Sequence, residues 1–321
     1  MEEKKLDVDK LAKQFLHKCQ SLPKIKVAVV YPCSQDALDG ALEAAKLGLI
    51  EPVLVGPKAK IQDLAEQIKI DISNYEVIDD ADSSSCAAKA VALAHAGKVD
   101  ALMKGSLHTD ELMHEVIKKE GGLRTKRRIS HAFIMAIEKY HKPFIVTDAA
   151  INIMPDLITK RDIIQNAIDL FHAFNQNVTP NVAILSAVET INPVMTSTTD
   201  AACLAKMAER GQITGAIVDG PFAYDNVFSL HAALAKNIKS PVIGEVDIFV
   251  VPNLEAGNIL AKQLVLIADA TAAGIILGAT VPIILTSRAD GVRSRLGSCA
   301  VAVLMANAKH TMREDHGYYS L

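Results

Sequence analysis

Short apolar segments alternate with segments of helical periodicity along most of the sequence. Residues 26–31, 52–55 and 101–103 are apolar runs of strand length, and the stretches 36–47 and 59–68 between them repeat their apolar residues at helical spacing. Alternation of this kind is typical of parallel sheets whose strands are joined by right-handed helical crossovers. We therefore predict an α/β fold made of doubly wound parallel sheets.

The same rhythm continues to the end of the chain. Only 4% of the residues are aromatic and none is Trp, so we expect a core of Ala, Val, Leu and Ile, which suits parallel strands covered by helices. Further strands are expected at 75–78, 144–146, 182–185, 216–218, 248–251 and 283–285, and further helices near 1–22, 85–96, 107–119, 156–175, 198–210, 228–236, 255–272 and 291–308.

One stretch, residues 245–264, combines a strand, a polar loop and a helix. Ile248–Val251 is apolar and β-branched, and Pro252 and Asn253 end it. In an open α/β sheet such a loop lies at the carboxyl end of a strand, where ligands bind. Gly257 permits close backbone approach, and the helix start offers free N–H groups to an anion. An ordinary strand-to-helix loop remains the alternative.

Polar residues also follow several other expected strands. Lys104 and Gly105 end one strand, and Lys is a good partner for phosphate. Polar strand ends line ligand clefts in α/β proteins, although each such residue is equally suited to cap a helix. The remaining candidates at or after strand ends are His108, Thr109, Asp148, Asn152, Asp219 and Glu255.

Ser287 and Arg288 directly follow the apolar strand expected at 283–285. The planar guanidinium group of an arginine matches the geometry of a phosphate. A serine hydroxyl can donate one hydrogen bond to a developing oxyanion or to a leaving group. From the spacing alone, a Ser-Arg pair in a loop is usually a helix cap or a pair of surface residues.

Five short segments stand out along the sequence: Lys104–Thr109, Thr147–Asn152, Asp219–Phe222, Phe249–Asn258 and Thr286–Asp290. Together they resemble the phosphate acetyltransferase and phosphate butyryltransferase family. The resemblance implies two α/β domains with a cleft between them, in the architecture of isopropylmalate dehydrogenase. It implies a discontinuous first domain, 1–138 and 279–321, and a second, dimerising domain, 139–278, with the basic stretch 118–128 as the expected crossing.

The resemblance implies the reaction acyl-CoA plus phosphate to acyl phosphate plus coenzyme A, by direct attack of phosphate on the thioester. We expect acetyl-CoA as the substrate, with phosphate butyryltransferase as the alternative. Ser287 and Arg288 are the implied catalytic pair. The acetyltransferase pattern has an acidic residue seven positions after the serine, where this chain has Ser294, so Asp290 is the candidate general base.

The resemblance implies substrate-binding roles for residues of the quoted segments. We assign these roles to Lys104, Gly105, His108, Thr109, Asp148, Asn152, Asp219, Asn253, Glu255 and Gly257.

We predict no metal and no cofactor other than the coenzyme A thioester. His108 and His114 are six residues apart, which is not the spacing of a zinc site, and no glycine-rich dinucleotide or P-loop motif is present. A metal- and NAD-dependent dehydrogenase of related architecture is the rival enzyme class, and its paired aspartates are absent from these loops. A non-catalytic acyl-CoA sensor is the remaining possibility.

The expected setting is the cytoplasm, without nucleic-acid or membrane partners. The net charge is −3, and the five widely spaced cysteines fit reduced thiols. The apolar stretch 264–285 approaches the length of a membrane span, but Gly274, Gly278 and Pro282 divide it into an expected helix and a strand. An alanine-rich helix over 264–274 is too apolar to face water, so we expect a homodimer.

Overall fold

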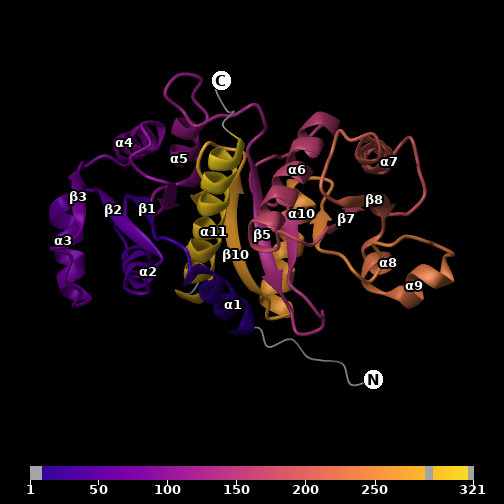
Figure 1. The fold of residues 1–321 in the computed structure, drawn as a ribbon, viewed down its shortest axis with the longest axis horizontal. Coiled ribbons are helices and arrows are strands. Elements are labelled where there is room, and N and C mark those ends of the chain that lie inside the picture. Colours follow the sequence, from indigo (N-terminus) through magenta and orange to yellow (C-terminus); the bar gives the residue numbers. More distant parts are fainter. Residues whose placement is uncertain (1–8, 286–291, 317–321) are drawn as a thin grey trace. The chain divides into compact units, whose positions relative to one another are not determined.

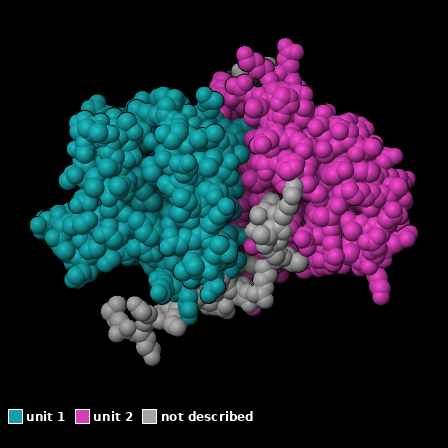
Figure 2. Space-filling model, turned by 180° about the vertical axis from the view of Figure 1, so that it is seen from behind, with its two compact units in different colours: residues 1–11, 128–272 teal, residues 12–127, 273–321 magenta. Residues whose placement is uncertain are grey.

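The computed structural model describes residues 9–285 and 292–316, and the chain forms two compact units. Unit 1 comprises residues 1–11 and 128–272, and unit 2 comprises residues 12–127 and 273–321 (Figure 2). The division at 127/128 falls at the end of the expected crossing. It differs from the boundary expected at 138/139, because the strand over 130–136 pairs with a strand of unit 1.

Unit 2 contains a sheet whose strands follow the order β3-β2-β1-β4-β11-β10. All neighbouring strands are parallel except β10 and β11, which are antiparallel. The strands are β1 (Ile25–Val30), β2 (Ile50–Gly56), β3 (Glu76–Asp79), β4 (Ala101–Lys104), β10 (Thr271–Leu277) and β11 (Ile283–Ile284). The helices are α1 (Asp9–Cys19), α2 (Gln35–Lys46), α3 (Lys58–Gln67), α4 (Ser83–His95), α5 (Thr109–Val116) and α11 (Val292–His316) (Figure 1).

Unit 1 contains strands in the order β5-β6-β9-β7-β8. β5 is antiparallel to β6, and the other neighbours are parallel, so the carboxyl ends of β6, β9, β7 and β8 share one edge. The strands are β5 (Ser130–Ala136), β6 (Phe144–Thr147), β7 (Asn181–Leu185), β8 (Ile217–Phe222) and β9 (Ile248–Val250). The helices are α6 (Leu157–Phe174), α7 (Thr196–Glu209), α8 (Tyr224–Phe228), α9 (Leu230–Ala235) and α10 (Leu254–Ile267).

The mixed α/β architecture confirms the predicted fold class. The buried residues of the strands and helices are mostly Ala, Val, Leu and Ile, as the composition predicts. Unit 1 also concentrates several of the few aromatic side chains. Phe144 and Phe249 lie edge to face with ring centroids 5.2 Å apart, and Phe228 stacks on Phe249 at 5.3 Å. Offset and edge-to-face pairs of this kind stabilise a core beyond their buried area.

Two strands and two helical segments differ from expectation. The helix expected over 264–274 is wrong: α10 ends at Ile267, Asp269 adopts a left-handed φ of 49°, and β10 follows. A left-handed residue after the last turn ends a helix, and the β-branched Ile275 and Ile276 then pair with β11. β5 was not expected, and the helix near 228–236 is two short helices separated at Ser229.

The apolar stretch that approached the length of a membrane span is thus part helix and part strand. No helix within the described ranges is long and apolar enough to cross a membrane.

Candidate active site

Lys104 is the last residue of β4, and its side chain is only 6% exposed. Its Nζ donates a hydrogen bond to the carbonyl oxygen of Gly105 at 3.2 Å. Gly105 lies so close to β1 that a Cβ atom would be 2.4 Å from the Val30 oxygen and 2.5 Å from the Tyr31 oxygen. Close contact with the end of β1 therefore requires glycine at this position.

His108 and Thr109 lie where α5 begins. His108 occupies the N-cap position, is exposed, and makes no capping hydrogen bond with its side chain. Thr109 is the first residue of the helix. The exposed imidazole of His108 is thus open to solvent at the same loop as Lys104, as a proton carrier or a ligand contact requires.

The expected catalytic residues Ser287, Arg288 and Asp290 lie outside the described residues. The strand before them is β11, which runs parallel to β4 with Ile284 opposite Met103. The carboxyl end of β11 therefore lies beside the strand end that carries Lys104.

In unit 1, Asp148 follows β6 and organises the loop after it. The residue is 2% exposed, and its Oδ1 accepts hydrogen bonds from the N–H groups of Ala150 at 2.9 Å and Ile151 at 3.0 Å. Its Oδ2 accepts bonds from the backbone N–H of Asn152 at 3.2 Å and from Asn152 Nδ2 at 2.6 Å. Because this carboxylate accepts four hydrogen bonds from its own loop, we infer that it holds the loop in shape and does not contact a ligand directly.

The loop after β9 packs directly on the loop after β6. A Cβ atom on Gly257 would lie 2.7 Å from the backbone oxygen of Asp148, and Asn258 Nδ2 donates to the oxygen of Ala149 at 3.2 Å. Asn253 caps α10, because its Oδ1 accepts from the N–H of Ala256 at 2.9 Å. Glu255, in the first turn, is exposed.

Asp219 lies apart from these two loops. It belongs to β8, at the edge of the unit 1 sheet, and its Oδ1 accepts a hydrogen bond from the N–H of Gly220 at 2.8 Å. The structure thus brings together the residues after β6 and β9, and separately those after β4. The substrate-binding role of each remains a prediction.

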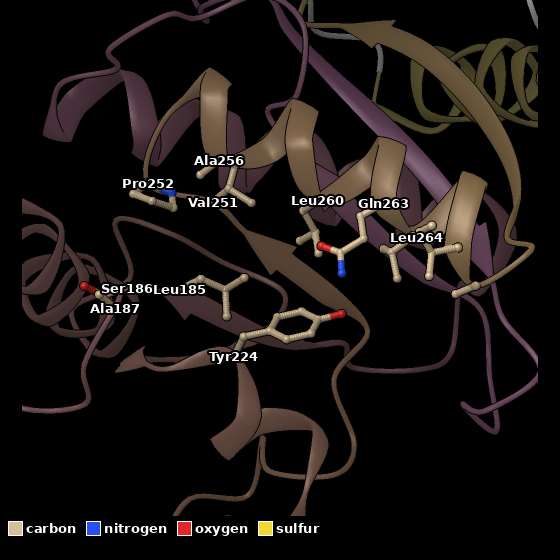
Figure 3. A pocket seen from close by; sticks show the side chains of 12 residues that line it. Leu185, Ser186, Ala187, Tyr224, Val251, Pro252, Ala256, Leu260, Gln263 and Leu264 are labelled. Atoms are coloured by element: carbon tan, nitrogen blue, oxygen red, sulfur yellow. The ribbon is translucent and has the colours of Figure 1, made fainter.

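A pocket of about 530 Å³ opens at the carboxyl ends of β7 and β9. Its wall is mostly apolar, with polar atoms from Ser186, Tyr224 and Gln263, and Figure 3 shows Leu260 and Gln263 of α10 pointing toward Tyr224. Burial raises the pKa of Tyr224 to about 12, so its hydroxyl stays protonated at neutral pH and can donate a hydrogen bond. The pocket is lined by Leu185, Ser186, Ala187, Tyr224, Val251, Pro252, Ala256, Leu260, Gln263, Leu264, Ile267 and Ala268.

Several polar groups of these regions are not marked by any pattern in the sequence. His131 of β5 is fully buried, and its Nδ1 has no hydrogen-bond partner in the described part of the chain. Burial lowers its pKa to about 4, against the opposing effect of the charge of Asp148. The β5–β6 register, with Ala132 opposite Thr147, places His131 opposite Asp148. The buried hydroxyl of Ser106, after Gly105, has no hydrogen-bond partner within residues 9–285 and 292–316. Tyr224 belongs to a helix of five residues, which is too short for periodicity to reveal.

Among the residues that the structure describes, no group of three or more His, Cys, Asp or Glu side chains is placed to hold a metal ion. The fold defines the chain as a two-unit α/β protein with polar loops at the carboxyl ends of parallel strands, which is where ligands bind in proteins of this class.

Comparison with known proteins identifies the family. Residues 83–303 match the family model described as "Phosphate acetyl/butaryl transferase". A phosphate acetyltransferase of Rickettsia prowazekii is 55% identical over 304 residues, 94% of this chain and 87% of the relative. A phosphate butyryltransferase of Clostridium acetobutylicum is 39% identical over 296 residues, 92% of this chain and 98% of the relative.

A solved structure agrees with these sequence matches. A branched-chain phosphotransacylase from Enterococcus faecalis V583 superposes with a TM-score of 0.75 at 28% identity, over 88% of this chain and 99% of that chain. The chain belongs to the phosphate acetyl/butyryl transferase family, which confirms the resemblance seen in the sequence.

Proposed function

We propose that the protein is a phosphate acetyltransferase, which converts acetyl-CoA and phosphate reversibly into acetyl phosphate and coenzyme A. The observation that carries the proposal is the difference in identity, 55% to a phosphate acetyltransferase against 39% to a phosphate butyryltransferase. In the forward direction a phosphate oxygen bonds to the thioester carbon. The C–S bond then breaks, and the thiolate of coenzyme A leaves with the bonding electrons and takes up a proton.

The catalytic roles rest on the family pattern in the sequence. We assign to Arg288 the binding of phosphate through its planar guanidinium group, and to Ser287 a hydrogen bond to the tetrahedral oxyanion or to the leaving thiolate. Asp290 is the candidate base for the phosphate proton. Lys104, buried at the end of β4, adds positive charge for an anionic substrate.

The test measures release of free thiol from acetyl-CoA and from butyryl-CoA, each with phosphate, with reactions lacking phosphate as blanks. We expect acetyl-CoA to have the higher kcat/KM. Ser287→Ala should lower kcat on the order of 10²–10³ with little change in KM, and Arg288→Ala should chiefly raise the KM for phosphate. No phosphate-dependent thiol release from either substrate would refute the proposal.

Phosphate butyryltransferase activity is the second candidate, and one feature of the sequence favours it. The acidic residue expected seven positions after Ser287 is replaced by Ser294, whereas Asp290 stands three positions after the serine. A higher kcat/KM for butyryl-CoA would select this alternative.

We also propose that the protein is a homodimer that uses the outer side of α10. Ile259, Leu266 and Ile267 are 66%, 74% and 77% exposed, although all three are large and apolar. Three such side chains on one helix fit a self-complementary contact between two copies. Light scattering should give about twice the chain mass of 34.5 kDa. A monomer at micromolar concentration, or a dimer unaffected by Leu266→Lys, would argue against this surface.

We place the enzyme in the cytoplasm and expect it to need no metal or added cofactor. All five cysteines are free thiols, which suits a reducing compartment. In the proposed reaction the coenzyme A thioester supplies the reactive group, so the protein contributes positioning and charge.

A further inference from the structure

The hydroxyl of Ser106 is buried and has no hydrogen-bond partner among the described residues. Ser106 lies two residues after Lys104, in the loop at the carboxyl end of β4. Buried hydroxyl groups in folded proteins are nearly always hydrogen-bonded, and an exception needs an explanation. Its place at the ligand-binding edge of a parallel sheet indicates that the missing partner is a ligand.

The backbone of this loop is fixed, so only the side chain of Ser106 can turn. The N–H of Ser106 donates to the oxygen of Tyr31 at 2.9 Å, and the N–H of Gly105 donates to the oxygen of Val30 at 2.9 Å. Gly105 has no room for a side chain, which holds the loop against β1. Rotation about the Cα–Cβ bond of Ser106 moves the hydroxyl between staggered positions without moving the loop.

Charges of both signs flank this loop: Lys104 ends the strand before it, and Asp110 and Glu111 lie in the first turn of the helix after it. Lys104 precedes the serine, and Lys60 lies over the ring of Tyr31 with Nζ 5.7 Å from the ring centroid. Two of the carboxylates have partners, because Asp80 pairs with Lys89 and Glu111 accepts a hydrogen bond from Ser83 Oγ. A phosphate ion has the charge for the lysines and spare acceptor oxygens for a hydroxyl.

We propose that Ser106 is a substrate-binding residue whose hydroxyl donates a hydrogen bond to an oxygen of the phosphate substrate. The inference rests on the proposed function, in which phosphate is a substrate. The hydroxyl gains its partner only when phosphate is bound, so the group contributes to affinity and not to the stability of the free protein.

The test compares Ser106→Ala with Ser298→Ala. Ser298 is also a buried serine of unit 2, but its Oγ accepts from the N–H of Gly274 at 3.0 Å and donates to the oxygen of Ser294 at 2.8 Å. Ser106→Ala should raise the KM for phosphate about 10- to 100-fold and leave the Tm of the free protein unchanged or higher. Ser298→Ala should lower the Tm and leave the KM for phosphate unchanged.

A second measurement does not depend on turnover. Inorganic phosphate alone should raise the Tm of the wild-type protein through mass action, and the rise should be smaller for Ser106→Ala at the same concentration. An unchanged KM together with an unchanged phosphate-induced rise would overturn the proposal, as would a fall in the Tm of free Ser106→Ala. An inactive wild-type protein would refute the proposed function, while the Tm comparison would still decide the role of Ser106.

Discussion

Replacement of Gly257 by alanine tests how tightly the loops after β6 and β9 are packed. The new Cβ would lie 2.7 Å from the backbone oxygen of Asp148, 2.8 Å from Val251 Cγ2 and 3.1 Å from Ala149 Cα. Two of these atoms belong to the backbone of one loop, and the carboxylate of Asp148 ties that loop down. The loop therefore cannot yield without loss of its own hydrogen bonds.

The magnitude follows from two opposing effects. Overpacking a rigid site costs about 1–3 kcal/mol, and the upper end applies where a backbone atom obstructs. Alanine gains about 1 kcal/mol over glycine inside a helix such as α10. The net loss in free energy of unfolding is roughly 2 kcal/mol, which lowers the Tm by about 4–8 °C for a unit of this size.

The matched control is Gly297→Ala, another glycine inside a helix. Its Cβ would lie 3.4 Å from the Cβ of Ala273, which is ordinary van der Waals contact, so the helix gain of about 1 kcal/mol should appear as a higher Tm. Thermal unfolding followed by circular dichroism measures both variants. A Gly257→Ala protein as stable as the wild type would refute the packing argument.

Three further results are expected. Asn253→Ala removes the cap of α10 and should lower the free energy of unfolding by about 1 kcal/mol in urea titrations, whereas Asn253→Ser should restore most of it. The pKa of His131 is about 4 in the folded chain, below the 6.5 of an ordinary exposed histidine, so the unfolded chain binds the extra proton and stability falls as pH drops from 6.5 to 4. His131→Gln should flatten this acid-side decline in urea midpoints, and an equally steep decline would assign it to other groups. Exhaustive chelation should leave acyl transfer unchanged, and a loss restored by one divalent ion would contradict this.

Much of the fold could be predicted because apolar strands and helices of different length alternate regularly. β10 could not, because residues 264–277 form one apolar run in which periodicity does not separate helix from strand. Helix α10 ends because Asp269 adopts a left-handed conformation, and a helix end of this kind is predicted from sequence only where the residue is glycine or asparagine. β5 follows a basic stretch and is antiparallel to β6. The alternation of strands and helices predicts only parallel strands, so it did not predict β5.

The candidate site was predictable to the extent that strand ends carry polar residues. The structure places Lys104 at the end of β4 and Asn253 at the start of α10, as this rule predicts, and their substrate-binding roles stay predictions. Ser106 and His131 were not, because whether a buried polar group has a partner depends on atoms brought near it by the tertiary fold. The side chain of Tyr224 reaches the pocket from a short helix between two connections, where no strand end or periodic pattern marks it.

Hydrogen bonding divides the polar residues at these strand ends into two kinds. The side-chain oxygens of Asp148 and Asn253 accept hydrogen bonds from N–H groups of their own loops, so these side chains stabilise local structure. The Oγ of Ser106 has no such bond, and the side chain of His108 faces solvent at the N-cap of α5 without a capping bond. Substitution of the first kind should therefore lower stability before it changes substrate affinity. We expect substitution of the second kind to leave stability unchanged, because these side chains make no hydrogen bonds within the described structure that the substitution would remove, and to change the affinity for substrate.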